Sequence, residues 1–202
     1  INLSSNMTFK SAFWRFFNYM LFRMNGVYIG KNPDIKYKIY LRKARNSKLT
    51  IGDNFTLYSD GNLNPLGRNL RSSICISENA EVSIGHNVGI SASSIRARKS
   101  ITIGNNVTIG ADCILLDSDG HSLDYRKRGT KEDIPVSLPI VIEENVLIGA
   151  RTTILKGVTI GARTIIGSGS IVTKSIPADC IAAGNPCKVI RHIDNWDIFS
   201  QR

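Results

Sequence analysis

The sequence predicts an all-β solenoid of six-residue repeats, preceded by a helix and interrupted by one long loop. Branched aliphatic residues occupy every sixth position of its later part: Ile142, Ile148, Ile154, Ile160, Ile166 and Val172. A helix repeats near 3.6 residues and a half-buried strand about every 2, so neither explains a period of six. Glycine follows the aliphatic at 149, 161 and 167, which is typical of a short strand followed by a tight corner.

The same repeat extends upstream. Aliphatic residues six apart recur in three earlier groups: Ile29, Ile35 and Leu41; Ile84 and Ile90; Ile103, Ile109 and Leu115. Stacked coils bury such residues against the coils above and below. If each coil has three sides, the stacked pairs are Ile142 with Ile160, Ile148 with Ile166, and Ile154 with Val172. The alternative, an antiparallel sandwich, does not keep a strict period over about thirty residues.

Residues 1–26 form a separate amphipathic helical segment in this interpretation. Aromatic residues and methionines recur at helical spacing from Phe9 to Met24, and Gly26 is placed to end the helix. The segment is too short to span a bilayer. Lys10, Arg15 and Arg23 would let it lie on an anionic membrane surface. Capping the open end of the solenoid is the favoured interpretation, because terminal repeats need a cap.

The solenoid domain covers residues 27–176, with a loop at 117–138. Leu115 and Ile142 are 27 residues apart, which is not a multiple of six, and the intervening segment "DSDGHSLDYRKRGTKEDIPVSL" is rich in charge. Such a segment is expected to protrude from the coils. The repeat stops after Pro177, so residues 177–202 are predicted to be a tail that leaves the solenoid and folds back.

The amino-acid composition limits the kinds of partner and the compartment that are expected for this protein. The formal net charge of +10 favours anionic partners, but no nucleic-acid-binding motif accompanies it, and nucleic-acid binding is not expected. The four cysteines include no CxxC pair. Reduced, buried cysteines indicate a reducing compartment, so the predicted location is the cytoplasm, with the helix offering a contact to the inner face of the membrane.

Three motifs carry a family resemblance. The "I-G-x-x-x-x" hexads, the run "ILKGVTIGARTIIGSGSIVTKSIPA" and the segment "AGNPCKVIR" are similar to those of hexapeptide-repeat acyltransferases, which include the galactoside and maltose type of sugar O-acetyltransferase. The resemblance implies a left-handed parallel β-helix and a homotrimer with active sites between subunits. It also implies acetyl transfer from acetyl-CoA to a sugar hydroxyl, as in surface-polysaccharide synthesis.

His121, within "DSDGHSLD" at the start of the loop, is the candidate general base. Functional residues concentrate on loops held by a rigid scaffold, and imidazole titrates near neutral pH. The resemblance agrees, because the family carries its base at a matching Gly-His. A carboxylate should orient the ring. The candidates are Asp117, Asp119, Asp124 and Glu132, of which Glu132 best fits the family's loop spacing.

The resemblance also assigns the binding residues. Coenzyme A is expected to contact Ala111, Gly149, Ala150, Ser168, Thr173, Lys174, Lys188 and Arg191. Of these, Lys188 and Arg191 would face the adenosine phosphates. Ser91 and Asp119 are the candidate acceptor-binding residues; Ser91 stands near the position where galactoside and maltose acetyltransferases carry asparagine, so the acceptor is open.

Three other functions are alternatives for this sequence. Amino-sugar N-acetylation would use the same base and groove. A metal-dependent hydratase on this fold needs three histidines around zinc, but no second histidine follows His121 before His192, so no metal is expected. A non-catalytic scaffold would not need His121 or the "GNPCKVIR" segment.

Overall fold

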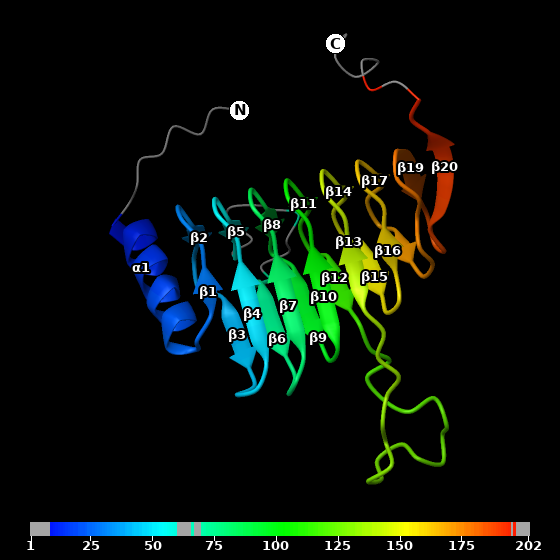
Figure 1. The fold of residues 1–202 in the computed structure, drawn as a ribbon, viewed down its shortest axis with the longest axis horizontal. Coiled ribbons are helices and arrows are strands. Elements are labelled where there is room, and N and C mark those ends of the chain that lie inside the picture. The colour runs from blue at the N-terminus through cyan, green and yellow to red at the C-terminus, as the bar shows by residue number, and fades with distance from the viewer. Residues whose placement is uncertain (1–8, 60–65, 67–69, 195, 197–202) are drawn as a thin grey trace.

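The computed structural model describes residues 9–59, 66, 70–194 and 196. Its strands form three sheets that run side by side along a stack of coils, with the helix at one end and the last strand at the other (Figure 1). From β1 to β18, consecutive strands along the chain fall in successive sheets, and nearly all neighbours pair in parallel. The architecture is therefore the predicted parallel β-helix.

The three sheets are named A, B and C. Sheet A contains β1 (Tyr28–Ile29), β4 (Lys48–Ile51), β7 (Glu81–Ile84), β10 (Ser100–Ile103), β13 (Ile140–Ile142) and β16 (Thr159–Ile160). Sheet B contains β2 (Asp34–Lys36), β5 (Thr56–Tyr58), β8 (Gly89–Ser91), β11 (Thr108–Ile109), β14 (Leu147–Ile148), β17 (Ile165–Ile166), β19 (Cys180–Ala183) and β20 (Lys188–His192). Sheet C contains β3 (Tyr40–Lys43), β6 (Ser73–Ile76), β9 (Ser94–Ala97), β12 (Ile114–Leu116), β15 (Thr153–Leu155) and β18 (Ile171–Val172).

The core consists of aliphatic columns, one inside each sheet. Ile142 pairs with Ile160 in sheet A, Ile148 with Ile166 in sheet B, and Ile154 with Val172 in sheet C. These are the three stacked pairs that the period predicted. All six side chains are at most 1% exposed. Because each buried aliphatic side chain is worth about 1.5–3 kcal/mol, the columns are the main favourable term of the fold.

The turns between sheets stack into three edges. The A–B edge contains 52–55, 85–88, 104–107, 143–146 and 161–164. The B–C edge contains 92–93, 110–113, 149–152 and 167–170. The C–A edge contains 44–47, 77–80, 98–99, 156–158 and 173–175, and the long loop leaves the stack there, between β12 and β13.

Asparagines form a ladder along the A–B edge. Asn54, Asn87, Asn106 and Asn145 all have φ between 57° and 59°, the left-handed region that asparagine tolerates better than most residues. The side-chain amides of Asn54, Asn87 and Asn106 each donate to the asparagine of the next coil over 2.8–3.0 Å. The repeat therefore uses asparagine as well as glycine to turn its corners. Gly149 has a different role, because a Cβ there would lie 2.5 Å from the Ser168 nitrogen of the next coil.

Helix α1 (Phe9–Met24) covers the first coil. Phe22 is fully buried, and the buried Asn18 donates its amide to the Tyr37 carbonyl over 2.6 Å. These contacts are those of a cap, as the favoured interpretation predicted. The opposite face of the helix exposes Phe16 and Met24. Among the described residues, no helix is long and apolar enough to cross a bilayer. Membrane contact stays a prediction.

The predicted tail continues the solenoid before it folds back. Ile176 bridges to Ile160, and β19 pairs in parallel with β17, which adds one more strand to sheet B. Strand β20 then returns antiparallel to β19. The repeat was lost from the sequence after Pro177, but the coil geometry lasts through Ala183. Residues 197–202 lie outside the described part of the chain.

All four cysteines are free thiols, and Cys113, Cys180 and Cys187 are buried. Burial raises the pKa of the Cys113 thiol, and it also raises the pKa of Cys187. Because the thiolate is the reactive form, Cys113 and Cys187 act as packing residues, which agrees with their predicted role.

Candidate functional site

The loop between β12 and β13 is anchored where it leaves the C–A edge (Figure 1). The Asp117 carboxylate accepts hydrogen bonds from the backbone nitrogens of Arg98 and Lys99, each over 2.7 Å. Asp119 pairs with Lys156 of the following coil at 2.6 Å. The loop root is thereby tied to the coil before it and to the coil after it, so its first residues have a defined position.

His121 lies just beyond this anchored root and is paired with Asp133. Its Nδ1 is 2.8 Å from Asp133 Oδ2. The histidine side chain is 74% exposed, whereas the Asp133 side chain is only 12% exposed. The carboxylate also accepts backbone hydrogen bonds from Ser122 over 2.6 Å and from Gly129 over 2.9 Å. Asp133 therefore links two distant parts of the loop while it holds the imidazole.

The predicted orienting residue, Glu132, is not the one that contacts His121. Glu132 is exposed and lies 3.6 Å from Lys127. The other three candidates are engaged elsewhere, Asp117 and Asp119 at the loop root and Asp124 with Arg126. The contact belongs to the neighbouring residue in the sequence, Asp133. Spacing alone could not separate two adjacent carboxylates, because the loop has no regular period.

Backbone hydrogen bonds from Ser122 and Gly129, together with the bond to His121, hold the pKa of Asp133 well below its usual range. The carboxylate is thus ionised wherever imidazole titrates, and an ionised carboxylate only accepts hydrogen bonds. Nδ1 of neutral His121 must then carry the proton. That tautomer leaves Nε2 with a free lone pair, so the pair has the arrangement of an oriented general base.

Four of the predicted coenzyme A residues lie on the B–C edge. Ala111, Gly149 with Ala150, and Ser168 stack on successive coils, since Arg151 donates to the Ala111 carbonyl and Gly169 to the Ala150 carbonyl, each over 2.8 Å. None of these side chains is larger than a hydroxymethyl group. The edge is narrow and rich in backbone, which suits an extended amide-bearing ligand.

The other predicted residues are placed differently. Thr173 and Lys174 are exposed on the C–A edge, the edge that also carries the loop. Lys188 and Arg191 are exposed on β20, opposite Ala183 and Ile181. On one chain, therefore, Thr173 and Lys174 do not share an edge with Gly149 and Ser168; sheet C lies between them.

Ser91 and Asp119, the candidate acceptor residues, are separated in the same way. Ser91 ends β8 beside the B–C edge, whereas Asp119 is at the loop root on the C–A edge. His86 accepts a hydrogen bond from the Asp53 backbone over 3.0 Å, which is a structural contact. Within the described residues, no group of three His, Cys, Asp or Glu side chains is arranged to hold a metal ion.

The fold and this loop define a hexapeptide-type parallel β-helix with a His–Asp pair beside its coils. Comparison with family models agrees: residues 139–174 match the bacterial transferase hexapeptide (six repeats), and residues 100–118 match the hexapeptide repeat of succinyl-transferase. These two segments thus carry the hexapeptide repeat, and the resemblance of the chain to the acyltransferases that carry this repeat is confirmed.

Named relatives point the same way. The galactoside O-acetyltransferase of Escherichia coli K12 is 42% identical over 98 residues, which cover 48% of this chain and 47% of that protein. The galactoside O-acetyltransferase of Lactococcus lactis is 42% identical over 99 residues, covering 48% and 45% of the two chains. The chain therefore spans about half the length of the named relatives it matches.

Two solved structures share the fold over most of their length. A hexapeptide-repeat acetyltransferase of Vibrio cholerae, complexed with acetyl coenzyme A, has a TM-score of 0.59 at 26% identity and covers 90% of this chain and 79% of its own. A galactoside acetyltransferase in complex with coenzyme A has a TM-score of 0.57 at 26% identity, covering 96% and 88%. The predicted fold class, a left-handed parallel β-helix, is confirmed.

Proposed function

We propose that the protein is an acetyltransferase that moves an acetyl group from acetyl-CoA to a sugar hydroxyl. The observation that carries the proposal is the His121–Asp133 pair, with its exposed imidazole held 2.8 Å from a strongly acidic carboxylate. The galactoside acetyltransferase that shares the fold binds coenzyme A, which supports the same donor here.

In the proposed mechanism, Nε2 of His121 takes the proton from the acceptor hydroxyl as its oxygen attacks the thioester carbonyl. The carbon–sulfur bond then breaks, and the leaving thiolate takes the proton from the imidazolium. Asp133 stays ionised throughout, holds Nδ1–H and stabilises the transient positive charge. General base catalysis of this kind contributes about 10²–10⁴-fold.

The donor is proposed to lie along the B–C edge. The small residues Ala111, Gly149, Ala150 and Ser168 leave backbone within reach of the pantetheine arm. Lys188 and Arg191 are exposed near the end of the stack, where their cationic groups would meet the adenosine phosphates. No metal ion takes part in this proposal.

We further propose a homotrimer with shared active sites. His121, Thr173 and Lys174 belong to the C–A edge, whereas Gly149, Ala150 and Ser168 belong to the B–C edge. A complete site would form where the C–A edge of one subunit meets the B–C edge of the next, as in a closed cyclic assembly. The last coils of sheet C also have apolar residues on their outer face, Leu155 and Ile171, which favours cover by a neighbour.

The cellular setting follows from the proposed reaction. Acetyl-CoA and reduced thiols both fit the cytoplasm, and sugar O-acetylation fits surface-polysaccharide synthesis. Contact of the exposed side of α1 with the inner membrane surface would place the enzyme near such acceptors.

A turnover assay tests the proposed function. Purified protein with acetyl-CoA is expected to release free thiol only when an acceptor sugar is added, because the imidazole needs a hydroxyl to activate. A panel should include galactosides, maltose, amino sugars and acidic sugars. Cleavage of the product by hydroxylamine identifies an ester, whereas a resistant product identifies an amide. Absence of both acceptor-dependent thiol release and coenzyme A binding would favour the scaffold alternative.

Mixing two inactive variants tests the shared site. His121→Ala removes the base, and Ser168→Trp fills the B–C edge, so each homotrimer is expected to be inactive. After co-refolding at equal amounts, about a quarter of sites should combine an intact loop with an intact edge, because each half is intact in half of the chains. Activity near that fraction is expected. Mixed oligomers with no recovered activity, or a monomer by light scattering, would contradict a shared site.

A further inference from the structure

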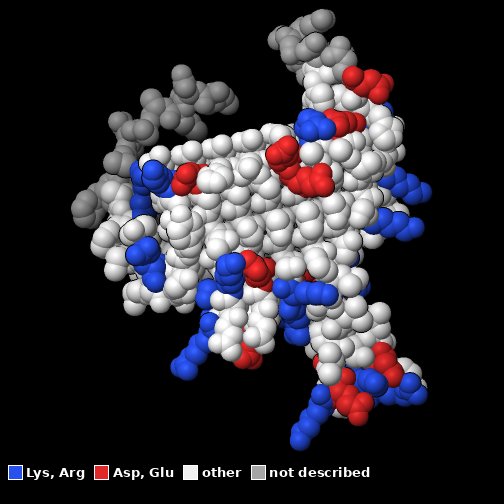
Figure 2. Space-filling model, in the orientation of Figure 1, with Lys and Arg blue, Asp and Glu red and all other residues white. Residues whose placement is uncertain are grey.

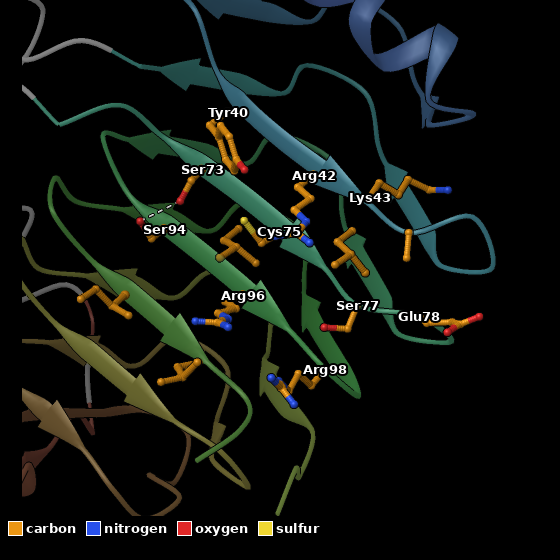
Figure 3. Close-up of a pocket in the computed structure, with 15 residues that line it drawn as sticks. Tyr40, Arg42, Lys43, Ser73, Cys75, Ser77, Glu78, Ser94, Arg96 and Arg98 are labelled. Atoms are coloured by element: carbon orange, nitrogen blue, oxygen red, sulfur yellow. Dashed lines mark hydrogen bonds between the residues drawn. The ribbon is translucent and has the colours of Figure 1, made fainter. Parts of the chain in front are cut away.

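The outer face of sheet C carries a broad groove over the early coils. It has a volume of about 960 Å³ and is lined by side chains of β3, β6, β9 and β12. Pairing places Arg42, Cys75 and Arg96 in one row across three strands, and Tyr40, Ser73 and Ser94 in the next. Small side chains therefore form the floor, where Ser73 Oγ donates to Ser94 Oγ over 2.9 Å, while the arginines stand on either side (Figure 3).

The groove is cationic. Arg42, Lys43, Arg96 and Arg98 line it with a single carboxylate, Glu78, so four positive and one negative charges leave a net +3. None of the four cationic side chains forms an ion pair with another described residue. Figure 2 shows Lys and Arg gathered along the edge from which the loop protrudes. A hollow with unneutralised cations on its walls attracts anionic ligands.

Arg98 provides a second indication that the groove binds an acidic ligand. Its Nε is buried and has no hydrogen-bond partner among the described residues. Leaving a charged donor buried and unpaired costs free energy, and an acidic oxygen in the groove would satisfy it. Arg42 and Arg96 lie two strands apart, so their Cα atoms are separated by about 10 Å. The groove can therefore engage acidic groups at more than one point.

The groove adjoins the candidate active site. Leu116, the last residue of β12, lines it, and the loop that carries His121 starts at the next residue. Asp117 binds the backbone of Arg98 and Lys99, so the groove wall and the loop root are held together. The groove occupies the early coils of sheet C, whereas most of the proposed donor residues lie on later coils. The two ligands would approach His121 from opposite directions along the stack.

We infer that this groove binds the acceptor and selects a saccharide that carries acidic groups, either carboxylates or phosphates. The identification of this ligand as the acceptor rests on the proposed function, whereas the binding of an acidic saccharide to the groove does not. Guanidinium groups form two parallel hydrogen bonds with either group. Arg42 and Arg96 are then specificity-determining residues, and Arg98 closes the end nearest the loop.

Direct binding tests the inference without any need for turnover. Titration calorimetry would compare a trigalacturonate, a glucose 1-phosphate and the neutral maltotriose. We expect the wild type to prefer an acidic probe over maltotriose. Arg42→Gln with Arg96→Gln should weaken that binding by roughly 10- to 100-fold, since charge-assisted hydrogen bonds are lost. The wild-type preference should shrink between about 50 mM and about 500 mM salt. The two acidic probes distinguish carboxylate from phosphate recognition.

Lys31→Gln with Lys38→Gln is the matched control, because it removes two exposed charges outside the groove. It should bind the acidic probes as the wild type does. No preference for either acidic probe, equal losses in the two double variants, or a change in oligomer mass in the Arg42/Arg96 variant would overturn the inference. If groove-dependent binding is found without acetyl transfer to any sugar, the proposed function fails and the acidic-saccharide site stands. If neutral sugars are acetylated and Arg42→Gln with Arg96→Gln leaves that turnover unchanged, the proposed function stands and the acidic-saccharide site fails.

Discussion

Replacing His121 by alanine should lower acetyl-transfer turnover by about 10²–10⁴-fold while coenzyme A binding stays nearly unchanged. The substitution removes the proposed base from an exposed loop position, and it touches neither the B–C edge nor the core columns. The expected signature is a fall in kcat with wild-type affinity for coenzyme A, measured by initial rates and by equilibrium titration.

His86→Gln is the control for this variant. His86 is an exposed histidine on the A–B edge, bonded to the Asp53 backbone, and has no place in the proposed site. It should keep wild-type turnover. Full activity in His121→Ala would remove the histidine from the mechanism and with it the main support for acetyl transfer by this loop.

Replacing Asp133 by asparagine should have the next largest effect, about 10²–10⁴-fold on kcat, because the ring would lose the partner that fixes its tautomer. Both carboxylate oxygens accept backbone N–H groups, whereas an amide has one acceptor oxygen and would point N–H at N–H. Glu132→Gln is the matched control, since the Glu132 side chain is exposed and lies 3.6 Å from Lys127 rather than against His121. Its turnover should change little.

The pH profile separates this positioning role from general damage. The folded pKa of Asp133 is depressed, so its contribution to loop stability is present above an ordinary Asp pKa of about 3.9 and is lost only as the pH falls through the lower folded value. The contribution of Asp133 to kcat/KM should therefore be constant above about pH 4, and Asp133→Asn should lower kcat/KM by the same factor throughout that range. A factor that varies with pH there, or a large effect of Glu132→Gln, would contradict the assignment.

The core could be predicted because one physical rule, stacking of inward aliphatics, repeats without interruption from Ile142 to Val172. The loop contact could not, since Glu132 and Asp133 differ by one position in a segment without a period. The cationic groove on sheet C could not be predicted either, for a related reason. Arg42, Cys75 and Arg96 are 33 and 21 residues apart, and these unequal coil lengths hide from the sequence that they share a row.

Two connections at the C–A edge differ in length, and the longer one costs more chain entropy to close. Between β15 and β16 three residues, 156–158, turn this corner, whereas between β12 and β13 the same corner takes the 23 residues 117–139. Closing the longer segment costs roughly 2 kcal/mol more in chain entropy, yet Leu115 still pairs with Ile154 across it. Strand pairing continues past the insert, so the insert must be ordered by contacts within the loop. Asp133 provides much of that order, and losing it should release the loop while leaving the solenoid's melting transition in place.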